Sequence, residues 1–150
     1  MQTFLPYSNF SKSLKALDSR RLGKQRVEAF HILNILLNRT NTKAWRNHPA
    51  VKMWQGHENA LKLYLNKAIK LWISKGYKNT MKLEIIEGEI IFPKWFGNSD
   101  FHTSHRSNLL RKDKEHYSKF GWKEKDNLDY IWPKELPEKY LCSKHCPKNY

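Results

Sequence analysis

Apolar side chains return every three or four positions from residue 10 to residue 37, and this spacing is typical of an α-helix. The pattern stops at the polar turn 38–42, so we predict one long helix that ends there. Asn9 or Ser11 would cap its start. Gly23 lies inside the pattern at a cost of roughly 1 kcal/mol relative to alanine. It therefore indicates either the close approach of another backbone or of a ligand, or a mild kink.

Two further helices are predicted downstream. A broad apolar stripe from about residue 50 to residue 75 indicates a helix that packs against at least one other helix. Pro49 suits its first turn, and Gly76 supplies the left-handed conformation that ends many helices. A third helix is predicted from residue 99 or 100 to about residue 117.

The remaining segments favour loops. Residues 81–92 hold two isoleucine pairs without clean alternation, so a short hairpin and an irregular connection are equally compatible with them. Residues 123–150 predict a loop-rich C-terminal tail that wraps the core. The expected fold class is mainly α: a compact three-helix bundle-like single domain that spans residues 1–150, with an extended N-terminal arm.

The charge balance points to the kind of partner. The chain has 28 lysines and arginines against 14 aspartates and glutamates, a net charge of +14. Such an excess repels itself in a compact state unless a polyanion balances it, so nucleic acid is the first partner to expect and an anionic membrane the second. No apolar run is long enough to span a membrane, and the N-terminus lacks a signal-peptide pattern. We therefore expect an intracellular protein without a membrane partner.

The main chemical feature is a cluster of cations between two carboxylates, in residues 18–28. One stripe of the predicted helix carries four polar side chains that lie three or four positions apart: Asp18, Arg21, Gln25 and Glu28. Arg20 and Lys24 lie on a neighbouring flank. The cluster is either a solvated helix surface held by ion pairs or one wall of a site for an anion.

Two short spacings suit metal ligands: His102 with His105, and Cys142 with His145 and Cys146. Zinc needs four ligands, and neither set is accompanied by a second matching pair, so no metal and no cofactor are expected. His105 would instead pack in the core or contact a phosphate. The chain has no P-loop and no serine-hydrolase motif, which disfavours nucleotide hydrolysis and serine-hydrolase chemistry.

Several short motifs occur in a fixed order along residues 1–122. They are residues 17–28 (LDSRRLGKQRVE), residues 45–49 (WRNHP), Gly56-His57, residues 75–77 (KGY) and residues 116–121 (HYSKFG). In their order and content, these motifs make the chain resemble the pyrimidine-dimer DNA glycosylase family, which includes the phage endonuclease of ultraviolet repair.

The resemblance implies a helical protein that clamps damaged double-stranded DNA, removes a base and cleaves the resulting abasic site. We expect such a protein to act as a monomer in the cytoplasm of a bacterial or phage-infected cell. In the family, the α-amino group attacks the sugar C1′ to form an imine, a carboxylate of the first helix assists, and β-elimination follows. Met1 is the expected nucleophile, because the bulky Gln2 disfavours removal of the initiator methionine. Arg21 stands where the family has its catalytic glutamate. The carboxylate is therefore expected from Glu28, our first choice, or from Asp18.

Under this hypothesis the basic side chains contact phosphates and carry no information about base sequence. The residues expected to bind DNA are Arg20, Arg21, Lys24, Arg26, Arg46, His48, His57, His105, Arg106, Arg111 and Lys112. Trp45, Tyr117 or Trp122 would fill or stack on the gap left by a displaced base.

Two other functions fit the same residues. A non-catalytic module that binds DNA or RNA would use the charge cluster only as a footprint. A metal-dependent nuclease would use Asp18, Glu28 and a nearby histidine, and its cleavage would stop in EDTA.

Overall fold

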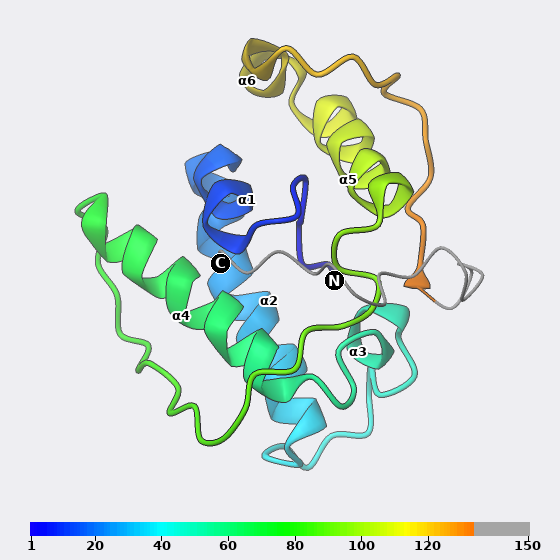
Figure 1. The fold of residues 1–150 in the computed structure, drawn as a ribbon. Helices are drawn as coiled ribbons and strands as arrows, with labels where there is room; N and C mark the ends of the chain where they lie inside the picture. The colour runs from blue at the N-terminus through cyan, green and yellow to red at the C-terminus, as the bar shows by residue number, and fades with distance from the viewer. Residues whose placement is uncertain (134–150) are drawn as a thin grey trace. The chain divides into compact units, whose positions relative to one another are not determined.

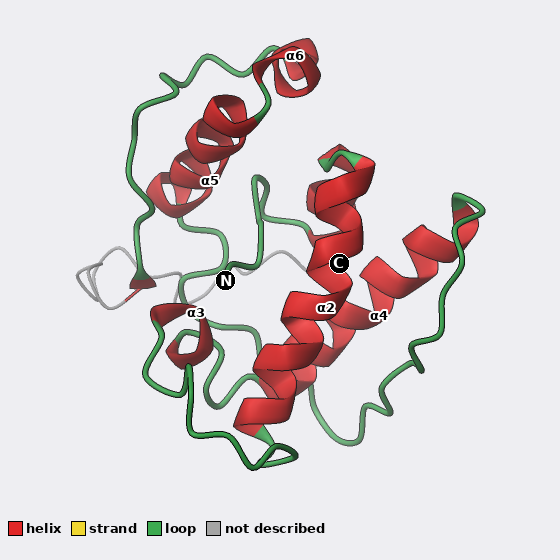
Figure 2. Cartoon of the chain, turned by 180° about the vertical axis from the view of Figure 1, so that it is seen from behind, coloured by secondary structure: helices red, strands yellow, loops and turns green. Residues whose placement is uncertain are grey.

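The structure, a computed structural model, describes residues 1–133, which form helices joined by turns and extended loops (Figures 1 and 2). Within these residues there is no strand, so the prediction of a mainly α fold is confirmed. The chain divides into two compact units. Unit one holds residues 1–3 and 19–93, and unit two holds, among the described residues, 4–18 and 94–133. The expected single domain stays a prediction, and most of the expected wrapping tail lies outside the described residues.

The helices belong to the two units as follows. Unit one contains α2 (Ser19–Leu36), α3 (Pro49–Lys52) and α4 (Glu58–Ser74). Unit two contains α1 (Phe10–Ala16), α5 (Ser99–Lys112), α6 (Lys114–Tyr117) and the short 3-10 helix η1 (Ser118–Phe120). No helix in residues 1–133 is long and apolar enough to cross a membrane.

The prediction of one long helix from residue 10 to residue 37 is wrong, because the chain leaves the helical path after α1. Asn9 caps α1 with its side-chain oxygen, as one of the two predicted caps. Leu17 then adopts an extended conformation, with φ −70° and ψ 142°. The next amide, that of Asp18, donates to the hydroxyl of Tyr117 at 3.2 Å, and not to a carbonyl of the preceding helical turn. The helical path resumes only at Ser19, in α2.

The second predicted helix is also divided. Its Pro49 opens α3, as predicted, but α3 ends at Lys52 and α4 begins only at Glu58. The turn between them contains Gly56, whose φ of 83° is a left-handed value that glycine adopts without strain. At the far end, Gly76 has a φ of 84° directly after the last helical turn, which confirms its predicted role as a stop.

The third predicted helix is divided as well, at Asp113. Asp113 has φ −154° and ψ 80°, which are not helical values, so α5 ends at Lys112. The carboxylate of Asp113 then accepts a hydrogen bond from the amide of His116 at 3.1 Å. A side-chain acceptor at this position starts a new helix, α6, which runs to the predicted end at Tyr117.

In unit one, α2 and α4 lie side by side and supply most of the buried side chains (Figures 1 and 2). Gly23 lies at their contact, where a Cβ atom would come within 3.0 Å of the Trp72 ring. The guanidinium of Arg26 lies over the same ring, 4.3 Å from its centroid. The group that approaches Gly23 is therefore a side chain, and not the backbone or ligand that the sequence suggested.

Residues 77–92 follow α4 as an extended loop, without the hairpin that the sequence allowed. The polar side of α4 holds this loop by its backbone. Asn66 both donates to the carbonyl of Glu84, at 2.9 Å, and accepts from its amide, at 2.7 Å. Lys62 donates to the carbonyl of Ile85 at 3.0 Å, and Asn59 donates to two further carbonyls. Side chains of α4 thus replace the partner strand of a hairpin.

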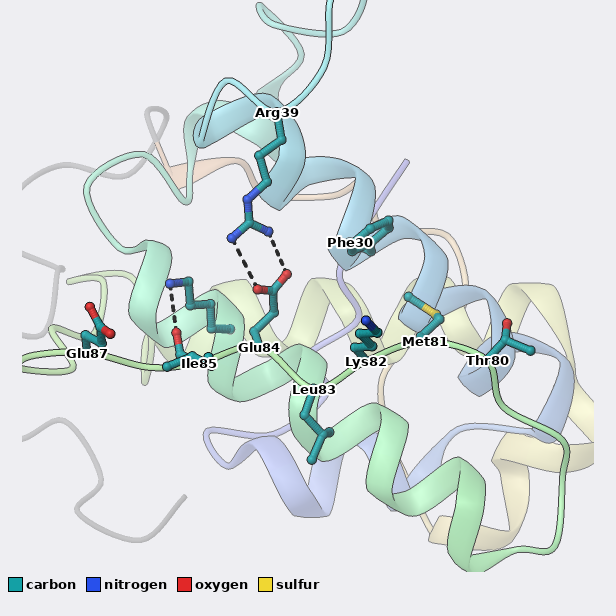
Figure 3. A pocket seen from close by; sticks show the side chains of 10 residues that line it. Phe30, Arg39, Thr80, Met81, Lys82, Leu83, Glu84, Ile85 and Glu87 are labelled. Carbon is teal, nitrogen blue, oxygen red and sulfur yellow. Dashed lines mark hydrogen bonds and ion pairs between the residues drawn. The ribbon is translucent and has the colours of Figure 1, made fainter.

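A groove of about 720 Å³ opens between this loop and the two helices (Figure 3). A bidentate ion pair between Arg39 and Glu84, with N–O distances of 2.7 and 3.3 Å, lies in it. The other lining residues are Phe30, Lys62, Thr80, Met81, Lys82, Leu83, Ile85 and Glu87. None of the residues predicted to catalyse or to bind DNA lines this groove.

In unit two, two histidines of α5 hold the backbone of Leu5. His105 Nδ1 accepts a hydrogen bond from the amide of Leu5 at 3.0 Å. His102 Nδ1 donates to the carbonyl of Leu5 at 2.7 Å, and its Nε2 accepts from the amide of Gly97 at 2.9 Å. Burial lowers the pKa of His102 to about 4 and the pKa of His105 well below its usual value of 6.5. Both rings are therefore neutral in the folded protein near pH 7.

Candidate functional site

The start of the chain is bound to α2 by both backbone groups of Gln2. The amide of Gln2 donates to Glu28 Oε2 at 3.0 Å, and its carbonyl accepts from Gln25 Nε2 at 3.0 Å. Gln25 and Glu28 are three positions apart on α2, so they share one face of the helix. This contact places the carboxylate of Glu28 one residue from the amino terminus of Met1.

Buried hydrogen bonds fix this part of the arm from a second side. The hydroxyl of Tyr64, in α4, donates to Gln25 Oε1 at 2.6 Å. The indole N–H of Trp54, in the turn before α4, donates to Thr3 Oγ1 at 3.0 Å. All four of these side chains are fully buried. Polar groups that are buried and satisfied in this way hold a single arrangement, so the arm is well positioned beside Glu28.

His48 completes the polar group around the amino terminus. It caps α3, and its Nδ1 accepts from the amide of Ala50 at 3.0 Å, so the neutral ring carries its proton on Nε2. Burial lowers the pKa of His48, the positive amino terminus lowers it further, and Glu28 opposes the shift. The imidazole is thus within electrostatic reach of both groups. We call Met1, Glu28 and His48 the terminal cluster.

Asp18, the second carboxylate predicted to be catalytic, belongs to unit two. Its Oδ1 accepts the hydroxyl proton of Tyr117, and its amide donates to the same hydroxyl. This pair holds the break between α1 and α2. Of the two candidate carboxylates, it is Glu28 that the structure brings to the start of the chain.

The cations of α2 differ in their surroundings. Arg20 and Lys24 are exposed, and Arg21 is partly exposed. Lys24 is four positions from Glu28, so its side chain lies on the same side of the helix as the carboxylate. Arg26, in contrast, stacks on Trp72 and donates to Asn79 Oδ1 at 2.7 Å, which directs it toward α4 and the loop that follows.

Two more predicted DNA-binding residues of unit one hold loops in place. Arg46 donates to Asn38 Oδ1 at 3.1 Å, across the loop between α2 and α3. His57 Nδ1 donates to the carbonyl of Ile91 at 3.0 Å. Both side chains are partly exposed, so these bonds leave part of each surface open to solvent.

In unit two, the predicted DNA-binding residues His105 and Arg106 have partners inside the protein. His105 is fully buried and bonded to Leu5, which removes it from the surface. Arg106 donates to Glu124 at 2.6 Å, to the carbonyl of Pro6 at 2.7 Å and to Thr103. These contacts give both side chains a structural role, and a guanidinium with three internal partners offers little to a phosphate.

Arg111 has a similar structural role. It donates to Asn108 Oδ1 and to the carbonyls of Asp126 and Leu128, and so holds the segment after η1 against α5. The side chain of Arg111 is nevertheless exposed, so its contact with a phosphate stays a prediction. Lys112, the next residue, is exposed. Its contact with a phosphate likewise stays a prediction.

Some residues of the site were not predicted from the sequence. Gln25 was noted only as a member of the polar stripe, and Thr3, Trp54 and Tyr64 were given no role beside the amino terminus. A signal for Gln25 exists, because an uncharged amide lies between apolar positions on the buried face of α2. The sequence does not, however, identify the partners of Gln25, which lie in the arm and in α4.

Metal ligands do not cluster in the part of the chain that the structure describes, where no group of three or more His, Cys, Asp or Glu side chains is placed to hold an ion. His102 and His105, whose spacing suits zinc, both direct Nδ1 to the backbone of Leu5. The second candidate set, Cys142, His145 and Cys146, lies outside the described residues.

Comparison with known proteins identifies the family. A family model described as pyrimidine dimer DNA glycosylase matches residues 1–85. This range is more than half of the chain, and it includes the terminal cluster, the cations of α2 and the whole of α4. No curated protein and no solved structure matches the chain. With the carboxylate of Glu28 held beside the amino terminus and a helix rich in arginine and lysine around it, the chain belongs to the pyrimidine dimer DNA glycosylase family of DNA-repair proteins.

Proposed function

We propose that the protein is a pyrimidine-dimer DNA glycosylase that also cleaves abasic sites, with the α-amino group of Met1 as its nucleophile and Glu28 as its assisting carboxylate. The observation that carries this proposal is the hydrogen bond of 3.0 Å from the amide of Gln2 to Glu28 Oε2. The family match makes damaged DNA the expected substrate. An α-amino group is partly uncharged at physiological pH, so its nitrogen lone pair is available for attack.

The proposed reaction begins at the sugar C1′ of the damaged nucleotide. The amine nitrogen forms a bond to C1′ as the glycosidic bond breaks, and the base leaves with the bonding electrons and takes up a proton. The amine then loses a proton, the C1′–O4′ bond opens with protonation of O4′, and an imine links Met1 to the sugar. Glu28 accepts the proton from the amine and returns it in a later step, as general base and then general acid.

Strand cleavage follows from the imine. Removal of a C2′ proton converts the imine to an enamine. The enamine electrons then form a C2′=C3′ double bond as the C3′–O3′ bond breaks, and the phosphate leaves with the electrons of that bond. Water then hydrolyses the imine and restores the amine. The buried bonds of Gln25 and Thr3 support this chemistry by keeping the arm in one position, since a misplaced nucleophile loses much of its rate.

The cations of α2 supply the electrostatic part of the proposal. Arg20, Arg21 and Lys24 would neutralise phosphates near the lesion. Arg21 and Lys24, seven and four positions before Glu28, bring positive charge to its side of α2. Their positive charge would also stabilise the phosphate that leaves. Arg46, His48, His57 and Lys112 extend the proposed footprint.

Borohydride trapping on duplex DNA with an abasic site tests the proposal. Reduction of the imine should give a covalent adduct in EDTA, and mass spectrometry of the peptides should place it on the α-nitrogen of Met1. Glu28→Gln should slow adduct formation about 100-fold or more, the usual size of a general acid–base contribution. Glu87→Gln, at an exposed glutamate of unit one, is the matched control and should react like the unaltered protein.

Three outcomes would overturn parts of the proposal. Absence of any adduct from the unaltered protein would exclude the imine mechanism and leave a non-catalytic DNA-binding module. An adduct on a lysine side chain would exclude Met1 as the nucleophile. Strand cleavage that needs a divalent metal and gives no adduct would favour the nuclease alternative.

A further inference from the structure

The three aromatic residues considered for the gap beside a displaced base differ sharply in accessibility. Tyr117 is fully buried and bonded to Asp18. The ring of Trp122 stacks on Tyr117, with centroids 5.6 Å apart, and its indole N–H donates to the hydroxyl of Tyr7 at 2.9 Å. Trp45, in contrast, is 51% exposed. Only the last of these three can leave its present contacts without disrupting packed side chains.

The backbone of Trp45 has an unusual conformation. Its φ is 68°, and in residues 1–133 Asn38 is the only other residue besides glycine with a positive φ. The left-handed region is disfavoured for a bulky side chain, and such strain persists only where surrounding contacts hold it. Two contacts do so here. The carbonyl of Trp45 accepts from the amide of His48 at 2.9 Å, and Arg46 is bonded to Asn38.

The position of Trp45 connects it to the terminal cluster. Its ring centroid lies 5.5 Å from that of His48, with the two planes tilted by 59°. His48 in turn is within electrostatic reach of the amino group of Met1 and of Glu28. The strained loop therefore presents a large exposed ring on the side of unit one where the chemistry is proposed.

We propose that Trp45 inserts its indole ring into the base stack of the bound duplex and occupies the space left by the displaced nucleotide. The ligand is thus a duplex with an unstacked or missing base, next to the sugar that Met1 attacks. This inference rests on the proposed function, and it adds a contact that determines preference for damaged DNA. Stacking on an aromatic ring suits the task because it tolerates any base sequence.

Binding to a duplex with a tetrahydrofuran abasic analogue tests the inference, since this analogue has no C1′ hydroxyl and forms no imine. Trp45→Ala should weaken binding to the analogue by about 10-fold or more, and should leave binding to the intact duplex unchanged. Trp45→Phe should retain most of the affinity because it keeps a ring. Ile73→Ala, which also removes a side chain that is 51% exposed in unit one, is the control and should bind as the unaltered protein does.

A fluorescent base makes the insertion directly visible. With 2-aminopurine beside the analogue, the unaltered protein should change its fluorescence on binding, and Trp45→Ala should abolish the change. Equal affinity and equal fluorescence for Trp45→Ala and the unaltered protein, in a protein that still forms the borohydride adduct, would overturn the inference alone. An unaltered protein that forms no adduct and does not prefer the analogue would overturn the proposed function together with it.

Discussion

Gln25 carries no charge, yet at the residue scale it connects the amino terminus to the rest of unit one. Its amide nitrogen donates to the carbonyl of Gln2, and its amide oxygen accepts from Tyr64. No aspartate or glutamate could make both contacts, because a carboxylate has no donor. The positioning of the nucleophile thus depends on a residue that the charge pattern does not distinguish.

Replacing Gln25 with leucine tests this role. Gln25→Leu keeps a similar volume but leaves the hydroxyl of Tyr64 and the carbonyl of Gln2 buried without their partner. The free energy of unfolding should fall by about 1–3 kcal/mol, measured by urea denaturation, and adduct formation should slow as the arm loosens. Gln55→Leu changes an exposed glutamine in the turn after α3 and should do neither. Equal adduct rates for Gln25→Leu and the unaltered protein would show that the arm needs no such support.

At the scale of elements, the sequence predicted which segments are helical better than where the helices end. Apolar spacing located every long helix, and Pro49 and Gly76 marked two boundaries correctly. The break at Leu17 and Asp18 was missed because apolar residues keep helical spacing across it. Its cause is a hydrogen bond from Asp18 to Tyr117, a residue 99 positions away. The spacing of apolar residues around Asp18 cannot indicate a partner so distant in the sequence.

For the candidate site, the sequence indicated which carboxylate to prefer but not which cations are bonded inside the protein. Glu28 could be preferred over Asp18 because it adjoins the buried part of the helix, and the structure places it beside the arm. The arginines of α5 could not be separated from those of α2 by residue type. Arg106 and Arg111 bind segments that precede or follow α5 by many residues, so only the fold shows that they are occupied.

Close packing of α2 on α4 gives a prediction at this scale. Gly23→Val places a branched side chain where even a Cβ atom would lie 3.0 Å from the Trp72 ring. The ring must move, and with it the guanidinium of Arg26, so the free energy of unfolding should fall by about 1–3 kcal/mol. Urea denaturation measures the change. Lys24→Val introduces the same side chain at an exposed neighbouring position and should have a much smaller effect.

At the scale of the whole molecule, the surface cations that give the net charge of +14 and the buried histidines differ in how they respond to pH. The surface cations suit a polyanion, and their charge is insensitive to mild acid. The histidines of α5 are different, because His105 accepts from the amide of Leu5 and His102 accepts from the amide of Gly97 only in their neutral forms. Protonation of His102 removes the acceptor that Gly97 uses, and protonation of His105 removes the acceptor that Leu5 uses.

Mild acid should therefore destabilise the protein. The pKa of His102 falls from 6.5 to about 4 on folding, so between these values the unfolded chain binds a proton that the folded protein does not. Stability from this group is complete above pH 6.5 and is lost as the pH falls toward 4. At pH 5 the loss from His102 alone is about 2 kcal/mol, and His105 adds to it in the same direction.

Urea denaturation at pH 7, 6 and 5 measures this dependence, in a range where most carboxylates of the unfolded chain stay ionised. His102→Gln should reduce the loss of stability between pH 7 and pH 5, because glutamine has a donor and an acceptor but takes up no proton. His31→Gln, at an exposed histidine of α2, is the matched control and should keep the full dependence. A free energy of unfolding that is equal at pH 7 and pH 5 would show that the two histidines of α5 are not buried in their neutral forms. If His102→Gln does not fold, the unaltered protein alone still decides the question. Its free energy of unfolding should fall as the pH is lowered from 6.5 toward 4, because the buried rings resist protonation in this range.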